Sequence, residues 1–136
     1  MGYILSWIGV AEPHKRKVLD ALKLKDSGKK EEALESEYDA IETARHYIVI
    51  EEGRDNIITR ASTLARLSNA FDVVSCFVDE RTMRSRASLW SAGVERWSVF
   101  HDAQESVYHL EITGHIPDIL EPIKQRLFKE QDQNGG

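Results

Sequence analysis

The chain has 136 residues, a formal net charge of −5, 41% hydrophobic residues and 30% charged residues. This composition is typical of one folded domain with its own core, and it excludes a disordered chain. The acidic balance disfavours nucleic-acid binding, although it permits a local basic patch. The single cysteine, Cys76, cannot form an internal disulfide, so nothing marks an oxidising compartment.

The opening run from Tyr3 to Val10 is apolar on both faces, which predicts an interior strand. It is too short to cross a membrane and has no basic start, so we expect no membrane association and a cytoplasmic location. Pro13 is placed to open a helix whose apolar stripe is Val18, Leu19 and Leu22. A helix after the first strand either leads to a parallel second strand or covers the sheet.

An acidic segment follows a loop at residues 26–30. From Glu31 to Glu42 the chain has six acidic residues and no basic one. Leu34, Tyr38 and Ile41 have helical spacing, but we favour a loop or short strand, and the conformation of 27–44 stays open. Charge runs usually face water, so we favour a solvated edge over a partner-binding surface.

A second interior strand is predicted over His46–Ile50, and a second helix follows it. Asn56 is a candidate N-cap for this helix. Its apolar side would consist of Ile57, Ile58, Ala61, Leu64, Ala65 and Leu67.

Residues 72–114 contain four runs rich in β-branched and aromatic residues, separated by turn signals, which predicts a four-strand antiparallel meander. A three-residue loop Ser91-Ala92-Gly93 would place Met83, Ala87 and Leu89 on the face of Trp97 and Val99. A two-residue turn would instead bury two arginines on that face, which costs several kcal/mol, roughly, for each guanidinium.

In the last hairpin, pairing Ser98 with His109 would put Tyr108, Leu110 and Ile112 on the face of Trp97. The turn would then be 102–105. Arg96 would lie opposite Glu111.

This register leaves a cationic, aromatic outer face. Its candidate binding residues are Arg84, Arg86, Arg96, Trp90, Phe100 and His109, with Val94 and Val107 among them. Arginine beside exposed aromatic residues is typical of protein interfaces. The alternative is that a helix covers the apolar members and that Glu95, Glu111 or the acidic segment pairs the arginines.

A last helix is expected from Pro117, with Pro122 either kinking it or marking its true start. Ile116, Ile119, Leu120, Ile123 and Leu127 would form its buried stripe. From about residue 131 the chain is polar and reads as a frayed tail or linker. The prediction is a single α+β domain over 1–136, with a central mixed, mostly antiparallel sheet covered by about three helices.

No motif in the chain fixes a chemistry: there is no phosphate loop, no nucleophile elbow and no zinc-type cysteine pair. We therefore expect no catalytic residues, no metal and no cofactor. Cys76 reads as a core residue. His101 and Asp102 could form a base and its orienting carboxylate, but Asp102 is more simply a turn residue, and His101 and His109 fall on opposite faces.

Two stretches, Gly2–Val10 and Trp97–Asp102 followed by Tyr108–Glu111, resemble small uncharacterised bacterial proteins with no assigned activity. The resemblance implies a bacterial cytosolic protein and transfers no site residue.

The sequence favours a non-enzymatic cytoplasmic domain that works by protein–protein contact, with a homo-oligomer left open. One form would be a toxin-neutralising immunity-type protein whose acidic surface blocks a basic nuclease. The alternatives are an enzyme or small-molecule binder near His101 and Asp102, and, less favoured, nucleic-acid binding through Arg84, Arg86 and Arg96.

Overall fold

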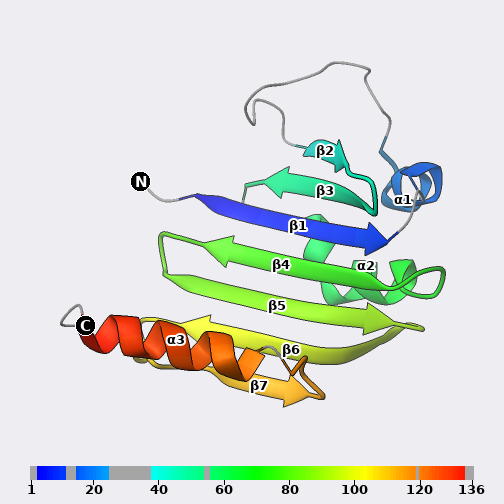
Figure 1. Cartoon of the computed structure of the whole chain (residues 1–136). Helices are drawn as coiled ribbons and strands as arrows, with labels where there is room; N and C mark the ends of the chain where they lie inside the picture. Colours follow the sequence, from blue (N-terminus) through cyan, green and yellow to red (C-terminus); the bar gives the residue numbers. More distant parts are fainter. Residues whose placement is uncertain (1–2, 12–14, 25–37, 54–55, 119, 134–136) are drawn as a thin grey trace.

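The computed structural model describes residues 3–11, 15–24, 38–53, 56–118 and 120–133. They form one seven-stranded sheet with three α-helices and one 3₁₀ helix (Figure 1). In chain order the elements are β1 (Ile4–Ala11), α1 (Lys15–Leu22), β2 (Tyr38–Glu42), β3 (His46–Glu52), η1 (Ile57–Thr59), α2 (Ala61–Leu67), β4 (Val73–Asp79), β5 (Arg84–Ser91), β6 (Val94–Asp102), β7 (Glu111–Gly114) and α3 (Leu120–Gln133). No helix in the described residues is both long and apolar enough to cross a membrane.

The strand order is β2-β3-β1-β4-β5-β6-β7, and each pairing between the described strands is antiparallel. The α+β class and the four-strand meander, here β4 to β7, are confirmed. The expectation of a mixed sheet is wrong, because β1 lies between β3 and β4 and runs antiparallel to both. The helix after β1 therefore covers the sheet instead of leading to a parallel strand.

The core lies between one face of the sheet and the layer formed by α1, η1 and α2 (Figure 1). Because side chains alternate along a strand, Ile8 and Val10 of β1 point to this side together with Val49 of β3 and Val73 of β4. These four side chains are at most 1% exposed, and Val18, Ile58, Leu64 and Leu67 close the core from the helix side. The apolar stripe predicted for the first helix is confirmed. Of the stripe predicted for the second helix, Ile58, Leu64 and Leu67 are buried, whereas Ile57 and Ala61 are exposed, so that prediction is right only in part.

The second helical segment begins differently from the prediction. Asn56 adopts a left-handed conformation, and its side chain makes no capping hydrogen bond. The cap comes from the sheet instead: Oε1 of Glu51 on β3 accepts a hydrogen bond from the Ile58 N–H at 2.9 Å. Glu51 is fully buried, and its cross-strand neighbour Ser6 is buried with it. This bond ties η1 to the inner face of the sheet.

The turn between β5 and β6 is shorter than predicted, yet the predicted faces are right. Ser91 pairs with Val94 across a two-residue turn in which Ala92 and Gly93 both have positive φ. The register then shifts between Leu89 and Trp90, so that Leu89 lies opposite Trp97. A bulge has the same effect on side-chain direction as one extra loop residue, so Leu89 still shares the face of Trp97.

The last hairpin has a longer loop than predicted. Ser98 pairs with Thr113 and Phe100 with Glu111, so the predicted pairs Ser98–His109 and Arg96–Glu111 are wrong. Residues 103–110 form turns between the strands. The register error is an even number of residues, which preserves faces, so Ile112 still lies beside Val99. The prediction is wrong for Tyr108 and Leu110, which lie in the loop before β7 and not on this face of a strand.

Helix α3 begins after a turn closed by the Leu120 N–H and the Pro117 carbonyl, so Pro122 falls in its first turn, where a missing N–H is tolerated. None of the residues of α3 is buried, so the predicted buried stripe is wrong for the part of the chain that the structure describes. Tyr108 holds the helix: its ring packs edge-on against Phe128 with centroids 5.1 Å apart, and its hydroxyl donates to Asp132.

The acidic segment is described only from Tyr38 onward, where the favoured short strand is confirmed as β2. The predicted loop at 26–30 and the acidic positions before 38 lie outside the described residues. So do Pro13, Ile119 and the last three residues of the predicted tail.

We expect Glu51→Ala to lower the free energy of unfolding by about 1–3 kcal/mol, because it leaves the buried Ile58 N–H without an acceptor. Glu51→Gln keeps an amide oxygen for this bond and is expected to cost clearly less. Urea unfolding of both variants measures the difference. Equal losses would show that the charge of Glu51, and not its acceptor oxygen, matters.

Candidate functional site

Four of the predicted binding residues lie together on the side of β5 and β6 that faces the helix layer. The prediction that this is the outer face of the sheet is therefore wrong: the face of Trp97 and Val99 is the one opposite α1 and α2. Arg84 pairs with Asp102 and Arg86 with Phe100, and paired residues share a face. Trp90 points to the same side, where it packs against the core. η1 lies against β1 and β4, and α2 lies against β5, whereas the described helices cover β6 less, so the Arg84 and Arg86 end of β5 and the neighbouring part of β6 stay open (Figure 1). We call Arg84, Arg86, Trp90, Glu95 and Phe100 the β5–β6 surface.

The arginines of this surface are neutralised by carboxylates. Nε of Arg84 lies 3.1 Å from Oδ2 of Asp102, and Nη2 of Arg86 lies 3.1 Å from Oε2 of Glu95. Both arginine side chains remain about half exposed, at 47% and 48%. The pairing of Arg86 with Glu95 is the alternative considered from the sequence. The surface is therefore polar and nearly balanced in charge.

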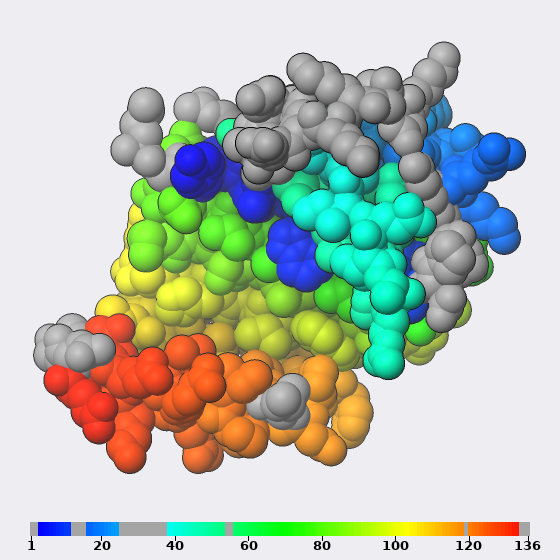
Figure 2. Space-filling model, turned by 45° about the horizontal axis from the view of Figure 1, so that its top comes forward, coloured from blue at the N-terminus to red at the C-terminus, as the bar shows by residue number. Residues whose placement is uncertain are grey.

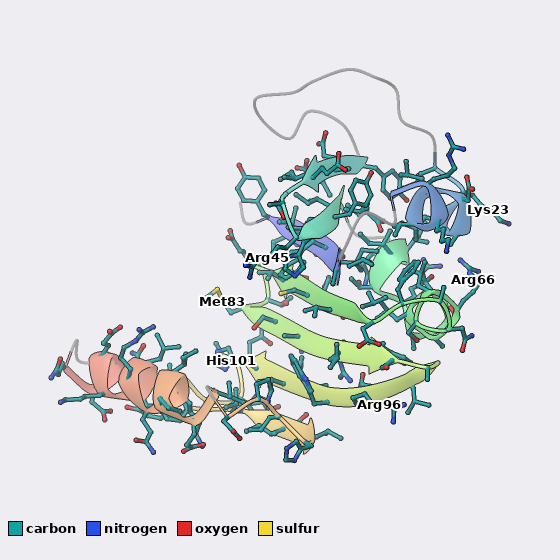
Figure 3. All side chains as sticks on the ribbon, turned by 45° about the vertical axis from the view of Figure 1, so that its right-hand side comes forward. Lys23, Arg45, Arg66, Met83, Arg96 and His101 are labelled. Carbon is teal, nitrogen blue, oxygen red and sulfur yellow. The ribbon has the colours of Figure 1, made fainter. Side chains whose placement is uncertain are left out.

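Arg96 is separate from these pairs. It follows Glu95 at the bulge and extends from β6 into solvent (Figure 3). Among the described residues, no carboxylate lies within ion-pair distance of Arg96. It is the exposed positive charge at the edge of the β5–β6 surface.

A pocket of about 140 Å³ opens between this surface and the start of α2. Its walls include the apolar side chains of Ala61, Leu64, Phe77 and Trp90. It is also lined by Thr59, Ser75, Arg86, Ser88 and Glu95. A liquid water occupies about 30 Å³, so the pocket has room for one short side chain or a few waters.

The polar groups at the base of the pocket already have partners. The hydroxyls of Ser75 and Ser88 are 2.6 Å apart, and the Trp90 indole N–H donates to Ser88 at 3.2 Å. Ser98 continues this row of small buried residues on β6. These bonds leave the base with little capacity to select a polar ligand.

His109, the last predicted binding residue, lies at the end of β6 and not within a strand. Its ring packs edge-on against Phe100, with centroids 5.7 Å apart, and its Nδ1 accepts a hydrogen bond from the Asp102 N–H at 2.8 Å. The other ring nitrogen, Nε2, lies 3.5 Å from Oε1 of Glu111. The ring has a structural role: it closes the β6–β7 loop.

His101 and Asp102 do not form a catalytic pair. They are neighbours in β6, so their side chains point to opposite faces. Nδ1 of His101 bonds to the His109 carbonyl at 2.6 Å, while the Asp102 carboxylate binds Arg84 and the Gln104 N–H. Asp102 is thus the turn residue that the sequence favoured. The two histidine rings lie 6.3 Å apart without converging, and the described residues contain no cluster of three metal-ligating side chains.

Burial acts to raise the pKa of the Asp102 carboxyl, but the Gln104 N–H and the Arg84 guanidinium outweigh it and hold this pKa below its usual range. Cys76 is the opposite case, because burial raises the pKa of its thiol. A thiol that resists ionisation is a poor nucleophile. The prediction that Cys76 is a core residue is wrong, because Cys76 is only partly buried and shares the face of Trp7, opposite the core.

Glu95 and the row of buried serines on β4, β5 and β6 (Ser75, Ser88 and Ser98) belong to this site, but the sequence did not predict them as site residues. Glu95 was considered as a partner for the arginines, but its place beside Arg86 depends on the bulge. Ser75 lies in the otherwise apolar run of β4, and a small polar residue there is a usable signal for a pocket base. Ser88 and Ser98 lie in strands of mixed polarity, which give no such signal. Comparison of the chain with protein-family models, with curated proteins and with solved structures finds no match.

We expect Asp102→Asn to be less stable than the wild type at pH 7, because the amide cannot attract the Arg84 guanidinium. Because the pKa of Asp102 is lower in the folded state than in the unfolded state, its ionised carboxylate stabilises the fold. This stability is fully present above the unfolded pKa of about 4 and is lost as the pH falls through the lower, folded-state pKa. The difference between the two proteins should therefore shrink below about pH 4. Urea unfolding of both proteins at about six pH values between pH 2 and pH 7 tests the sign of this change in the stability difference. A difference that does not change with pH would contradict the role of the charge.

Proposed function

We propose that this protein is a non-enzymatic protein–protein interaction domain and that the β5–β6 surface binds its partner. The observation that carries the proposal is the apolar-walled pocket between Trp90, Phe77 and α2, with the Arg86–Glu95 ion pair at its rim. A pocket that receives one anchoring side chain, surrounded by arginine and aromatic residues, is the usual centre of a protein interface.

The size and chemistry of the pocket favour a side chain over a free small molecule. At about 140 Å³ it is smaller than typical ligand pockets, which span roughly 300–1,000 Å³. The serine hydroxyls at its base are bonded to each other, so they offer little to a polar ligand. A small-molecule binder stays the second candidate, with this pocket as its site instead of His101 and Asp102.

The charge arrangement disfavours nucleic acid as the partner. Arg84 and Arg86 already pair with carboxylates, and a polyanion would have to displace Asp102 and Glu95. The net charge of −5 adds long-range repulsion. The same negative charge would suit a basic partner, and an immunity-type protein that blocks a basic toxin is one concrete form of the proposal.

Affinity capture from the native cell lysate tests the proposal with three variants. Arg84→Glu/Arg86→Glu reverses two charges of the surface, and Ala61→Trp blocks the exposed mouth of the pocket. Arg16→Glu/Lys17→Glu reverses two exposed charges on α1 and is the matched control. We expect the first two variants to lose the partner by roughly 30-fold or more, and the α1 control to retain it.

A partner that the surface variants retain would contradict the assigned site and direct attention to the acidic segment. Capture of nucleic acid that falls steeply with salt would instead support the nucleic-acid reading. If the wild-type chain captures nothing, the interaction proposal fails.

A further inference from the structure

The face of the sheet opposite α1 and α2 carries a broad group of apolar side chains, and most of it is not covered by the residues that the structure describes. Alternation along the strands places thirteen apolar side chains on it. They are Leu5, Trp7, Ile41, Ile48, Ile50, Val74, Cys76, Val78, Ala87, Leu89, Trp97, Val99 and Ile112. Figure 2 shows part of this face, with β1, β4 and β5 visible between the β2–β3 hairpin and α3. We call these thirteen residues the open face.

The two faces of the same strands differ sharply in burial. On β1, Ser6, Ile8 and Val10 point to the helix layer and are fully buried, whereas Leu5 and Trp7 on the open face are only partly buried. At the edges, Ile41 is 49% exposed and Ile112 is 38% exposed. A sheet face of this composition normally lies against a second layer.

Helix α3 supplies a fragment of such a layer. It stands on the open-face side of the sheet, opposite α1 and α2, near β6 and β7 (Figures 1 and 3). It contains no buried residue, and its Leu127 is 50% exposed. The helix therefore leaves β2, β3, β1, β4 and β5 without a described cover, and it carries apolar surface of its own.

We propose that the open face binds a second copy of this chain, forming a two-fold symmetric dimer in which two sheets pack face to face. Packed sheets lie about 10 Å apart with strands nearly aligned. A two-fold axis perpendicular to the strands would place β7 of one subunit over β7 of the other. Each α3 would then collide with the sheet of the partner subunit. An axis along the strands reverses the strand order of the partner and avoids that collision.

When the axis runs along the strands, its position follows from which strands are uncovered. The five strands β2-β3-β1-β4-β5 are centred on β1, so the axis runs over β1 of both subunits. Each α3 then lies beside the β2 edge of the partner subunit, where Leu127 can meet the exposed Ile41 of the other copy. One placement thus covers the open face and part of α3 at once.

Trp7 lies at the centre of this interface. It is near the middle of β1, and its neighbour on the same face is Gly9. A Cβ at Gly9 would lie 3.6 Å from the Trp7 ring, so the ring lies along the strand over the space that glycine leaves. A large aromatic group at the centre of an apolar patch is the usual position of a hot spot.

The area is sufficient for a stable dimer. Five strands about 4.8 Å apart and about five residues long, at roughly 3.3 Å per residue, span roughly 400 Å² in projection. The flank of α3, 14 residues long, adds on the order of 200 Å². Because accessible area exceeds projected area, each subunit would bury close to the about 800 Å² per partner of a stable interface.

Sedimentation or light scattering over a concentration series tests the dimer with the full chain. We expect a particle of twice the 15.5 kDa chain mass. Trp7→Glu should raise the dissociation constant by roughly 100-fold or more. Val74→Glu is a second variant: Val74 is 37% exposed on the open face, so the monomer tolerates the charge.

Ile57→Glu is the matched control, because Ile57 is 40% exposed on η1 at the opposite face. It should remain a dimer, and circular dichroism confirms that each variant is folded.

A wild-type chain that stays monomeric up to its solubility limit would overturn the proposal, and so would a dimer that resists both open-face variants. Neither result touches the proposed function, since Arg84, Arg86 and the pocket lie on the other face of the sheet. Conversely, a failure of partner capture through the β5–β6 surface leaves the dimer test unchanged.

Discussion

The whole sheet depends on one strand. β1 forms hydrogen-bonded ladders with β3 on one side and β4 on the other, joining a local hairpin to a local meander. Trp7 pairs with Ile50, 43 residues away, and with Cys76, 69 residues away, so both ladders connect distant parts of the chain. Each half could pair its own strands through short turns, but neither half has a core alone. The core cannot form before β1 has paired with β3 and β4. This long-range pairing therefore carries the largest cost in chain entropy during folding.

The two faces of β1 then divide the molecule. Ile8 and Val10 build the core with the helix layer, while Trp7 and Leu5 face the open side. The buried polar residues on the core side are small or bonded: the serine row crosses β4, β5 and β6, and Glu51 holds η1 through the Ile58 N–H. These contacts set the position of the helical layer, and that position leaves the helix side of β5 and β6 free for a pocket.

The protein therefore presents two surfaces with different chemistry on opposite sides of one sheet. The β5–β6 surface is polar, with the Arg86–Glu95 ion pair at the rim of a small pocket and the Arg84–Asp102 ion pair beside it. The open face is apolar and broad, which suits the matching face of a second copy. If both are occupied, a dimer would carry two partner sites pointing outward, and binding of a bivalent target would gain from linkage without any new contact.

The strand alternation and turn signals by themselves determined the α+β class, the four-strand meander and the residues on each face of it. Leu89 and Ile112 were assigned to the face of Trp97 correctly even though both hairpin registers were wrong, because an even shift keeps the face. The same patterning selected Arg84, Arg86, Trp90 and Phe100 as one surface. What only the tertiary structure decided was which face the helices cover, which carboxylates neutralise the arginines, and where α3 lies. Each of these depends on contacts between residues far apart in the chain, and local patterns carry no information about such contacts.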